Sequence, residues 1–128
     1  MKAIETREDI SILVHAFYDR IREDELLGPI FNGHIAEEKW PVHLSKLTDF
    51  WESNLFGVAA FTGSPSKKHI QVDANLGHTI SQAHFAHWLE LWFETIDGKF
   101  EGTMAKKAKA SAQKMAMGQF LAILKHRS

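Results

Sequence analysis

The chain contains no cysteine among its 128 residues. This absence excludes disulfide bonds, thiolate metal sites and any cofactor attached through cysteine thioethers. A signal peptide is not expected, because the N-terminal stretch "MKAIETREDI" turns acidic at once and lacks an apolar segment. No apolar run approaches the length of a membrane span. The sequence therefore predicts a soluble, cytoplasmic protein with no membrane partner.

A charge excess of either sign is lacking as well. The 15 Lys and Arg residues nearly balance the 16 Asp and Glu residues, and the net charge is −1. Such a chain has no overall basic field, so nucleic acid is not an expected partner. Neither internal repeats nor low-complexity linkers divide the sequence. Its length and its 45% hydrophobic content fit one globular domain covering residues 1–128.

The chain does have helical spacing along most of its length. A first helix is expected to begin after Thr6, with Asp9 completing a weak capping box, and to end at Gly28-Pro29. Its apolar stripe consists of Ile10, Leu13, Val14, Phe17 and Ile21. After a short connector, Pro41 suits the first turn of a second helix, which Gly57 is expected to end.

Two further helices are expected in the second half of the chain. Thr79 and Gln82 form a capping-box pair ahead of a helix whose apolar face runs from Phe85 to Ile96. Thr103 can cap the last helix, which is rich in Ala and Met. Because no convincing sheet pattern is present, the predicted fold class is all-α.

The region from Gly57 to Ile80 is the longest stretch without helical spacing, and it is long for so small a domain. Within it, "SPSKKHIQV" places His69 at the head of a short β-like run, where no helix face organises it. The four Trp and nine Phe residues exceed the need of a slim four-helix bundle. Together these features indicate that the chain encloses a large, flat, apolar ligand.

Four polar-tipped residues stand out, although each has an ordinary interpretation. Tyr18, the only tyrosine, reads alone as an amphipathic side chain whose hydroxyl reaches water. His43 reads as a half-exposed histidine, and Trp88 as a core residue whose N–H meets a backbone carbonyl. His69 alone reads as a solvated loop histidine. None of the four is specific by itself.

The order of several short segments is more informative. Phe17-Tyr18 is followed along nearly the whole chain by "GPIF", "WPVHLSKLTDFW", "KKH" and "HFAHWLELW". In this order and wording the chain resembles the group III truncated haemoglobins, and thirteen residues separate Tyr18 from Phe31, as in that family. The glycine pairs that mark the other truncated globin groups are missing. The resemblance implies a truncated globin fold, a two-over-two helical sandwich around non-covalent haem b.

The same resemblance implies roles for individual residues. His69 takes the position of the proximal iron ligand, and haem iron accepts a neutral imidazole well. Tyr18, His43 and Trp88 fall on the distal side, where donors can hold a ligand that gains negative charge on binding. Other expected haem contacts are Phe31, Lys46, Leu47, Phe50, Trp51, Lys68 and Phe85, together with Trp88 itself.

Some assignments stay open. The span from His69 to Trp88 is longer than in many family members, so His78 is an alternative proximal ligand. His34, in the connector, could swing toward the distal side but is expected at the surface.

The function also has alternatives. The resemblance implies binding of dioxygen and other diatomic gases such as nitric oxide and carbon monoxide, and three distal donors favour slow release over simple oxygen transport. The same pocket could belong to an enzyme that oxidises nitric oxide or activates peroxide, with an external reductase and with His43 shuttling a proton. A non-haem metal bundle is more remote, because paired Glu-x-x-His motifs are missing and His84 with His87 is too little for a site.

Overall fold

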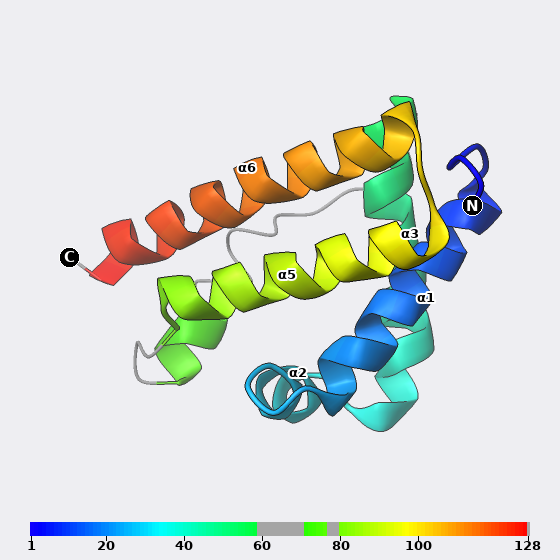
Figure 1. Ribbon diagram of the computed structural model, residues 1–128. Helices are drawn as coiled ribbons and strands as arrows, with labels where there is room; N and C mark the ends of the chain where they lie inside the picture. Colours follow the sequence, from blue (N-terminus) through cyan, green and yellow to red (C-terminus); the bar gives the residue numbers. More distant parts are fainter. Residues whose placement is uncertain (59–70, 77–79, 128) are drawn as a thin grey trace.

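The computed structural model describes residues 1–58, 71–76 and 80–127, and most of them are helical (Figure 1). The named elements are α1 (Arg7–Glu23), α2 (Gly28–His34), the short 3-10 helix η1 (Glu37–Lys39), α3 (Trp40–Phe56), α5 (Gln82–Lys99) and α6 (Thr103–Arg127). In the described residues the β-structure is limited to one isolated bridge between Lys2 and Phe100. The predicted all-α class is confirmed.

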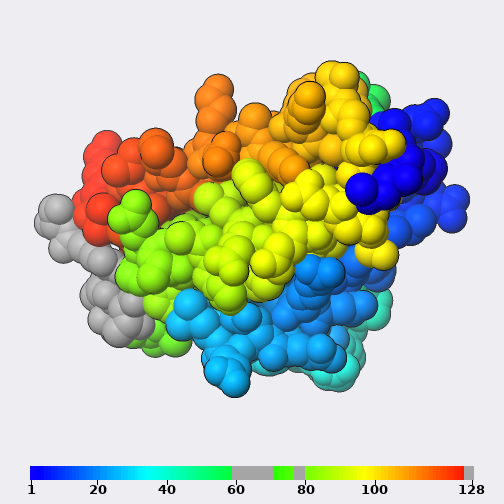
Figure 2. All heavy atoms as spheres, viewed as in Figure 1, coloured from blue at the N-terminus to red at the C-terminus, as the bar shows by residue number. Residues whose placement is uncertain are grey.

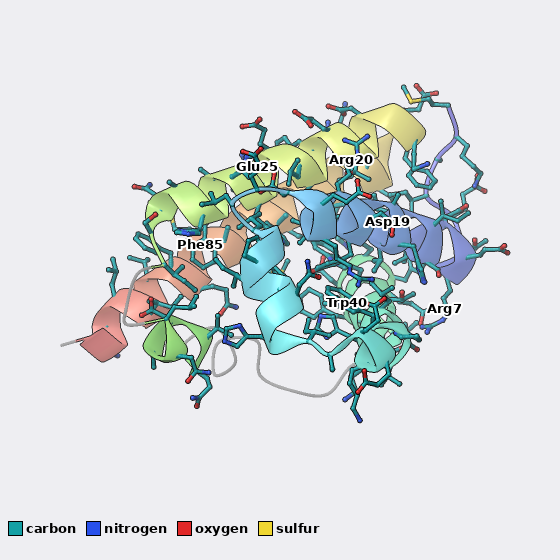
Figure 3. All side chains as sticks on the ribbon, turned by 90° about the horizontal axis from the view of Figure 1, so that it is seen from below. Arg7, Asp19, Arg20, Glu25, Trp40 and Phe85 are labelled. Atoms are coloured by element: carbon teal, nitrogen blue, oxygen red, sulfur yellow. The ribbon has the colours of Figure 1, made fainter. Side chains whose placement is uncertain are left out.

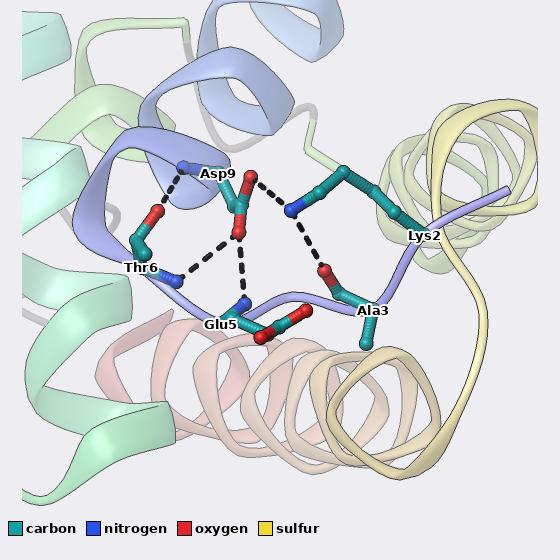
Figure 4. A network of polar contacts seen from close by, with 5 residues as sticks. All are labelled: Lys2, Ala3, Glu5, Thr6 and Asp9. Carbon is teal, nitrogen blue, oxygen red and sulfur yellow. Dashed lines mark hydrogen bonds and ion pairs between the residues drawn. The ribbon is translucent and has the colours of Figure 1, made fainter.

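Helix α1 begins with the predicted capping box (Figure 4). Thr6 is extended, and its hydroxyl accepts a hydrogen bond from the Asp9 amide at 3.2 Å. The Asp9 carboxylate in turn accepts from the amides of Thr6 and Glu5 and pairs with Lys2 Nζ at 2.7 Å. The hydrogen bond from Lys2, followed by that from the Glu5 amide, lowers the pKa of Asp9 to about 2.

The end of α1 differs from the prediction. The helix ends at Glu23, because Asp24 leaves the helical conformation with ψ at 138° and its carboxylate accepts from two following backbone amides at 3.0 and 2.9 Å. Gly28 and Pro29 start α2 instead of ending α1, so the connector expected there is partly helical. A Cβ at Gly28 would lie 2.7 Å from the carbonyl oxygen of Arg22, which explains why glycine fits this corner.

The long helices form two packed pairs. Helix α1 packs against α3 and α5 packs against α6, while α1 also contacts α5. In Figure 2, α6 and α5 lie side by side across one face, with α1 beneath α5. The predicted apolar stripe of α1 is confirmed, because all five of its residues are fully buried: Ile10, Leu13, Val14, Phe17 and Ile21. In the described part of the chain, no helix has the length and apolarity needed to cross a bilayer.

The ends of α3 were predicted correctly from the sequence, whereas the N-terminal cap of α5 was not. Pro41 lies in the first turn of α3, and Gly57 ends the helix with a left-handed φ of 72°, both as predicted. Helix α5 is capped by Ser81 rather than by Thr79. The Ser81 amide donates to Nδ1 of His84 at 2.9 Å, so an imidazole takes the place that a Glu or Gln usually fills.

The region expected to be irregular is helical at residues 71–75, so the β-like reading of the run after His69 is wrong there. Asp73 lies on this segment with 2% of its surface exposed, and it accepts a hydrogen bond from the Ile80 amide at 3.1 Å. This contact ties the segment to the residues just before α5.

Candidate functional site

Three polar-tipped side chains from three helices meet in one place. Tyr18 comes from α1, His43 from α3 and Trp88 from α5. The rings of Tyr18 and His43 lie edge to face, with centroids 6.2 Å apart at 84°. The Trp88 indole lies near enough to the Tyr18 hydroxyl to lower the pKa of the phenol. The structure therefore brings together the three side chains that the resemblance puts on the distal side.

The environment of Tyr18 decides what its hydroxyl can do. The side chain is only 6% exposed, and this burial raises the pKa of the phenol well above its usual value. An indole nitrogen can only donate, so Trp88 can act only as a donor toward the Tyr18 oxygen, and its proximity works against the rise in pKa. Tyr18 thus stays a neutral phenol whose own proton can be donated to a further acceptor.

Of the predicted apolar haem contacts, Phe31 lies next to this group and the others are half-buried at the edge of the core. The Phe31 ring of α2 lies 5.9 Å from that of Tyr18. Leu47 and Phe50, on α3, are half-buried and pack against the core from its edge. Phe85, at the start of α5 (Figure 3), contacts the ring of Phe120 on α6 at 5.7 Å. These half-buried surfaces can bind one side of a flat apolar molecule.

Two other predicted contacts lie differently. Trp51 is 3% exposed and stacks on Trp92 with centroids 4.6 Å apart, so it belongs to the packed centre of the molecule. Lys46 is exposed on α3, one residue before Leu47. Its ammonium group therefore lies at the surface and not among the buried rings.

The predicted proximal side falls on residues outside the described ranges. His69, the expected iron ligand, is among them, and so are Lys68 and the alternative ligand His78. Their assignments stay predictions.

The other candidate histidines have structural partners. His34 is exposed, and its Nδ1 lies 2.9 Å from the Ile30 carbonyl oxygen. His84 caps α5, and Nε2 of His87 lies 2.6 Å from an Asp24 carboxylate oxygen. Burial opposes ionisation of Asp24, but the hydrogen bond from His87 and two backbone amides keep its pKa below the usual range. Within the described residues, no three His, Asp or Glu side chains gather as a metal site.

Sequence reasoning left two residues of the site without a role. Trp40, the first residue of α3, lies edge to face with His43 at 5.5 Å and within 6.0 Å of Tyr18. The guanidinium carbon of Arg22 lies 4.6 Å from the centroid of the Trp40 ring. The three-residue spacing from Trp40 to His43 indicates a shared helix face, but no sequence signal pointed to Arg22.

Comparison with known proteins agrees with this geometry. No family model matches the chain. A curated relative, the group 3 truncated hemoglobin ctb of Campylobacter jejuni, is 33% identical over 112 residues, which cover 86% of this chain and 84% of the relative. The crystal structure of a group III truncated hemoglobin from Campylobacter jejuni aligns with a TM-score of 0.85 and 31% identity, over 96% of this chain and 95% of the other. The chain therefore belongs to the group III truncated haemoglobins.

Proposed function

We propose that this protein binds haem b non-covalently, with His69 as the proximal ligand, and binds dioxygen and other diatomic gases beside Tyr18, His43 and Trp88. The observation that carries the proposal is the meeting of these three side chains from α1, α3 and α5 next to half-buried apolar surfaces. Membership of the truncated haemoglobins supports it independently.

The residues present fit a haem. Phe31, Leu47 and Phe50 supply apolar surface for a flat macrocycle, and all three remain half-buried at the edge of the core. The absence of cysteine is compatible with haem b held without a covalent link. Lys46, and Lys68 by its sequence position, can neutralise carboxylates of the cofactor at the mouth of the site. When bound, the iron supplies the site at which a diatomic gas is held.

Tyr18 and Trp88 act as an ordered pair toward such a gas. The Trp88 N–H can donate to the Tyr18 oxygen, which leaves the tyrosine proton for another acceptor. A ligand atom with partial negative charge is such an acceptor, and donors fixed in advance need no reorganisation to meet it. Tyr18 is then the direct donor, and Trp88 acts mainly by positioning it.

His43 gives the site a second capacity. Its ring lies edge to face with Tyr18, so an imidazole, a group that enzymes use to transfer protons, lies next to the direct donor. This arrangement favours a second candidate function, the oxidation of nitric oxide or the activation of peroxide with an external reductase as electron source. Stopped-flow turnover with nitric oxide or peroxide distinguishes enzyme from binder, and His43→Ala should lower turnover more than it lowers gas affinity.

Haem titration tests the proposal first. Adding haem to the purified protein should produce a strong Soret band that saturates at one haem per chain, and carbon monoxide should shift this band after reduction. A protein that gives no Soret band after reconstitution contradicts the proposed function.

A further inference from the structure

Among the described residues, the indole N–H of Trp40 finds no hydrogen-bond partner. The side chain is 3% exposed, and in the described residues the buried side-chain atoms without a partner are Trp40 Nε1 and Asn54 Oδ1. Trp92 behaves differently, since its N–H donates to the Ala108 carbonyl at 3.2 Å. Buried polar groups are nearly always paired, with protein or with ordered water. The Trp40 N–H therefore calls for an acceptor that none of the described residues supplies.

The surroundings of Trp40 determine the kind of acceptor that fits. The centroid of its ring lies 5.5 Å from that of His43 and 6.0 Å from that of Tyr18. Figure 3 shows it at the start of α3, next to α2. The partner must be small, because the nitrogen is enclosed, and it must have other polar neighbours in order to stay. The imidazole of His43 and the hydroxyl of Tyr18 belong to the rings in contact with Trp40. Water meets all of these conditions.

Arg22 holds the indole in this position. Its guanidinium lies over the Trp40 ring, and the same group donates to Glu37 at 2.5 Å and to Asn32 at 3.2 Å. One arginine of α1 thus contacts α2, η1 and the first residue of α3. A guanidinium that is itself held by two hydrogen-bond acceptors and lies over the ring restricts rotation of the indole.

We propose that Trp40 is a further residue of the distal site: its N–H binds an ordered water molecule beside His43, and Arg22 fixes the indole that holds it. The consequence for gas binding rests on the proposed function, whereas the water site itself does not. An ordered water beside the distal donors has to leave or rearrange when a gas enters, so it slows association rather than release.

The direct test is a water-contact experiment by NMR on protein labelled with ¹⁵N-tryptophan. The rotating-frame cross-peak, which separates contact from proton exchange, should join the Trp40 indole proton to water in the haem-free protein. Trp92 is the internal control, because its N–H is bonded to a carbonyl and should show no such peak. Absence of the peak at Trp40 overturns the proposal, and this holds whether or not the protein binds haem.

The kinetic test uses carbon monoxide association with the reduced, haem-loaded protein. Trp40→Phe keeps an aromatic ring but removes the N–H, and it should raise the association rate about three- to tenfold while release changes little. Arg22→Met should act in the same direction by a smaller factor. Arg20→Met is the matched control, since Arg20 pairs with Glu94 at the surface at 3.7 Å, and it should leave the rate unchanged.

The outcomes separate the two proposals. A Soret band with an unchanged association rate in Trp40→Phe means that Trp40 only packs against its neighbours, and the water site is rejected while the haem site stands. A water contact at Trp40 in a protein that never binds haem supports the water site and rejects the proposed function. Should Trp40→Phe fail to fold, the NMR measurement on the unsubstituted protein still decides the question.

Discussion

Two groups of aromatic side chains share α1, α3 and α5 but use their polar atoms differently. In the centre, Phe17 and Trp51 pack against Trp92, whose single N–H is taken by a backbone carbonyl. The distal group, defined as Tyr18, Trp40, His43 and Trp88, lies beside it, with Trp88 stacked on Trp92 at 6.1 Å.

The two groups differ in whether their buried hydrogen-bond donors have acceptors within the protein. In the central group the rings are buried and the Trp92 N–H is hydrogen-bonded to the Ala108 carbonyl. In the distal group the Trp40 N–H has no partner among the described residues, and the buried Tyr18 stays a neutral phenol because burial raises its pKa. Buried donors without acceptors lower stability, so a site that keeps them is arranged for a molecule from outside.

The largest expected effect separates the groups by stability. Trp92→Ala removes the ring at the middle of the central group and should lower the free energy of unfolding by about 3–5 kcal/mol. Tyr18→Phe removes only a hydroxyl from the distal group and should lower it far less. Urea denaturation of the haem-free variants measures both changes. Equal losses for the two substitutions would mean that the distal group is part of the structural core.

The next effect separates the groups by ligand release. A hydrogen bond to a charged acceptor is worth about 1.5–3 kcal/mol, and each 1.4 kcal/mol is about a tenfold change in rate. Tyr18→Phe should therefore speed dioxygen release by roughly ten- to a hundredfold, and Trp88→Phe by a smaller factor within that range.

The double variant sharpens this prediction. Because Trp88 acts partly through Tyr18, the two substitutions together should be less than additive. Carbon monoxide, which is less polarised when bound, should respond much more weakly. Stopped-flow displacement of dioxygen provides the rates. If neither single variant changes the release rate by threefold, these residues only pack, and the truncated globin fold stands without a polar gas site.

The smallest expected effect lies far from both groups, at the start of α1. The pKa of Asp9 falls from 3.8 to about 2 in the folded protein, so its ionised form stabilises the fold. That contribution is fully present above about pH 4 and is lost as the pH falls toward 2. Asp9→Asn should thus be less stable than the parent at pH 7, and the gap should close below pH 3. A gap that does not change with pH would contradict the role of the charge.

Much of this architecture could be predicted from local signals. The capping box at Thr6, the stripe of α1 and the left-handed Gly57 each depend on neighbours a few residues apart, and the structure has all three. Gly28 and Pro29 were misread because the same residues can end one helix or begin the next. Helix α1 ends before Gly28 because the Asp24 carboxylate accepts hydrogen bonds from the amides of Leu26 and Leu27.

The site was harder to predict in detail. Tyr18, His43 and Trp88 were predicted to lie together only because the order of short sequence segments resembles that of the family. Residue spacing alone could not predict this, since their meeting depends on how three helices pack. The proximity of the Trp88 indole to the Tyr18 hydroxyl depends on tertiary packing, which sequence spacing does not encode. Arg22 was missed for the same reason, because a cation over a ring eighteen residues away leaves no periodic signal.

The proposed function requires above all that His69 binds the haem iron. The most direct measurement is the absorption spectrum of His69→Ala and His78→Ala after reconstitution with haem, ferric and ferrous, compared with the parent protein. The account predicts that His69→Ala loses haem or changes its ligation, that added imidazole restores a histidine-like spectrum, and that His78→Ala behaves as the parent. An unchanged ferrous spectrum in His69→Ala, with haem lost in His78→Ala, would contradict it.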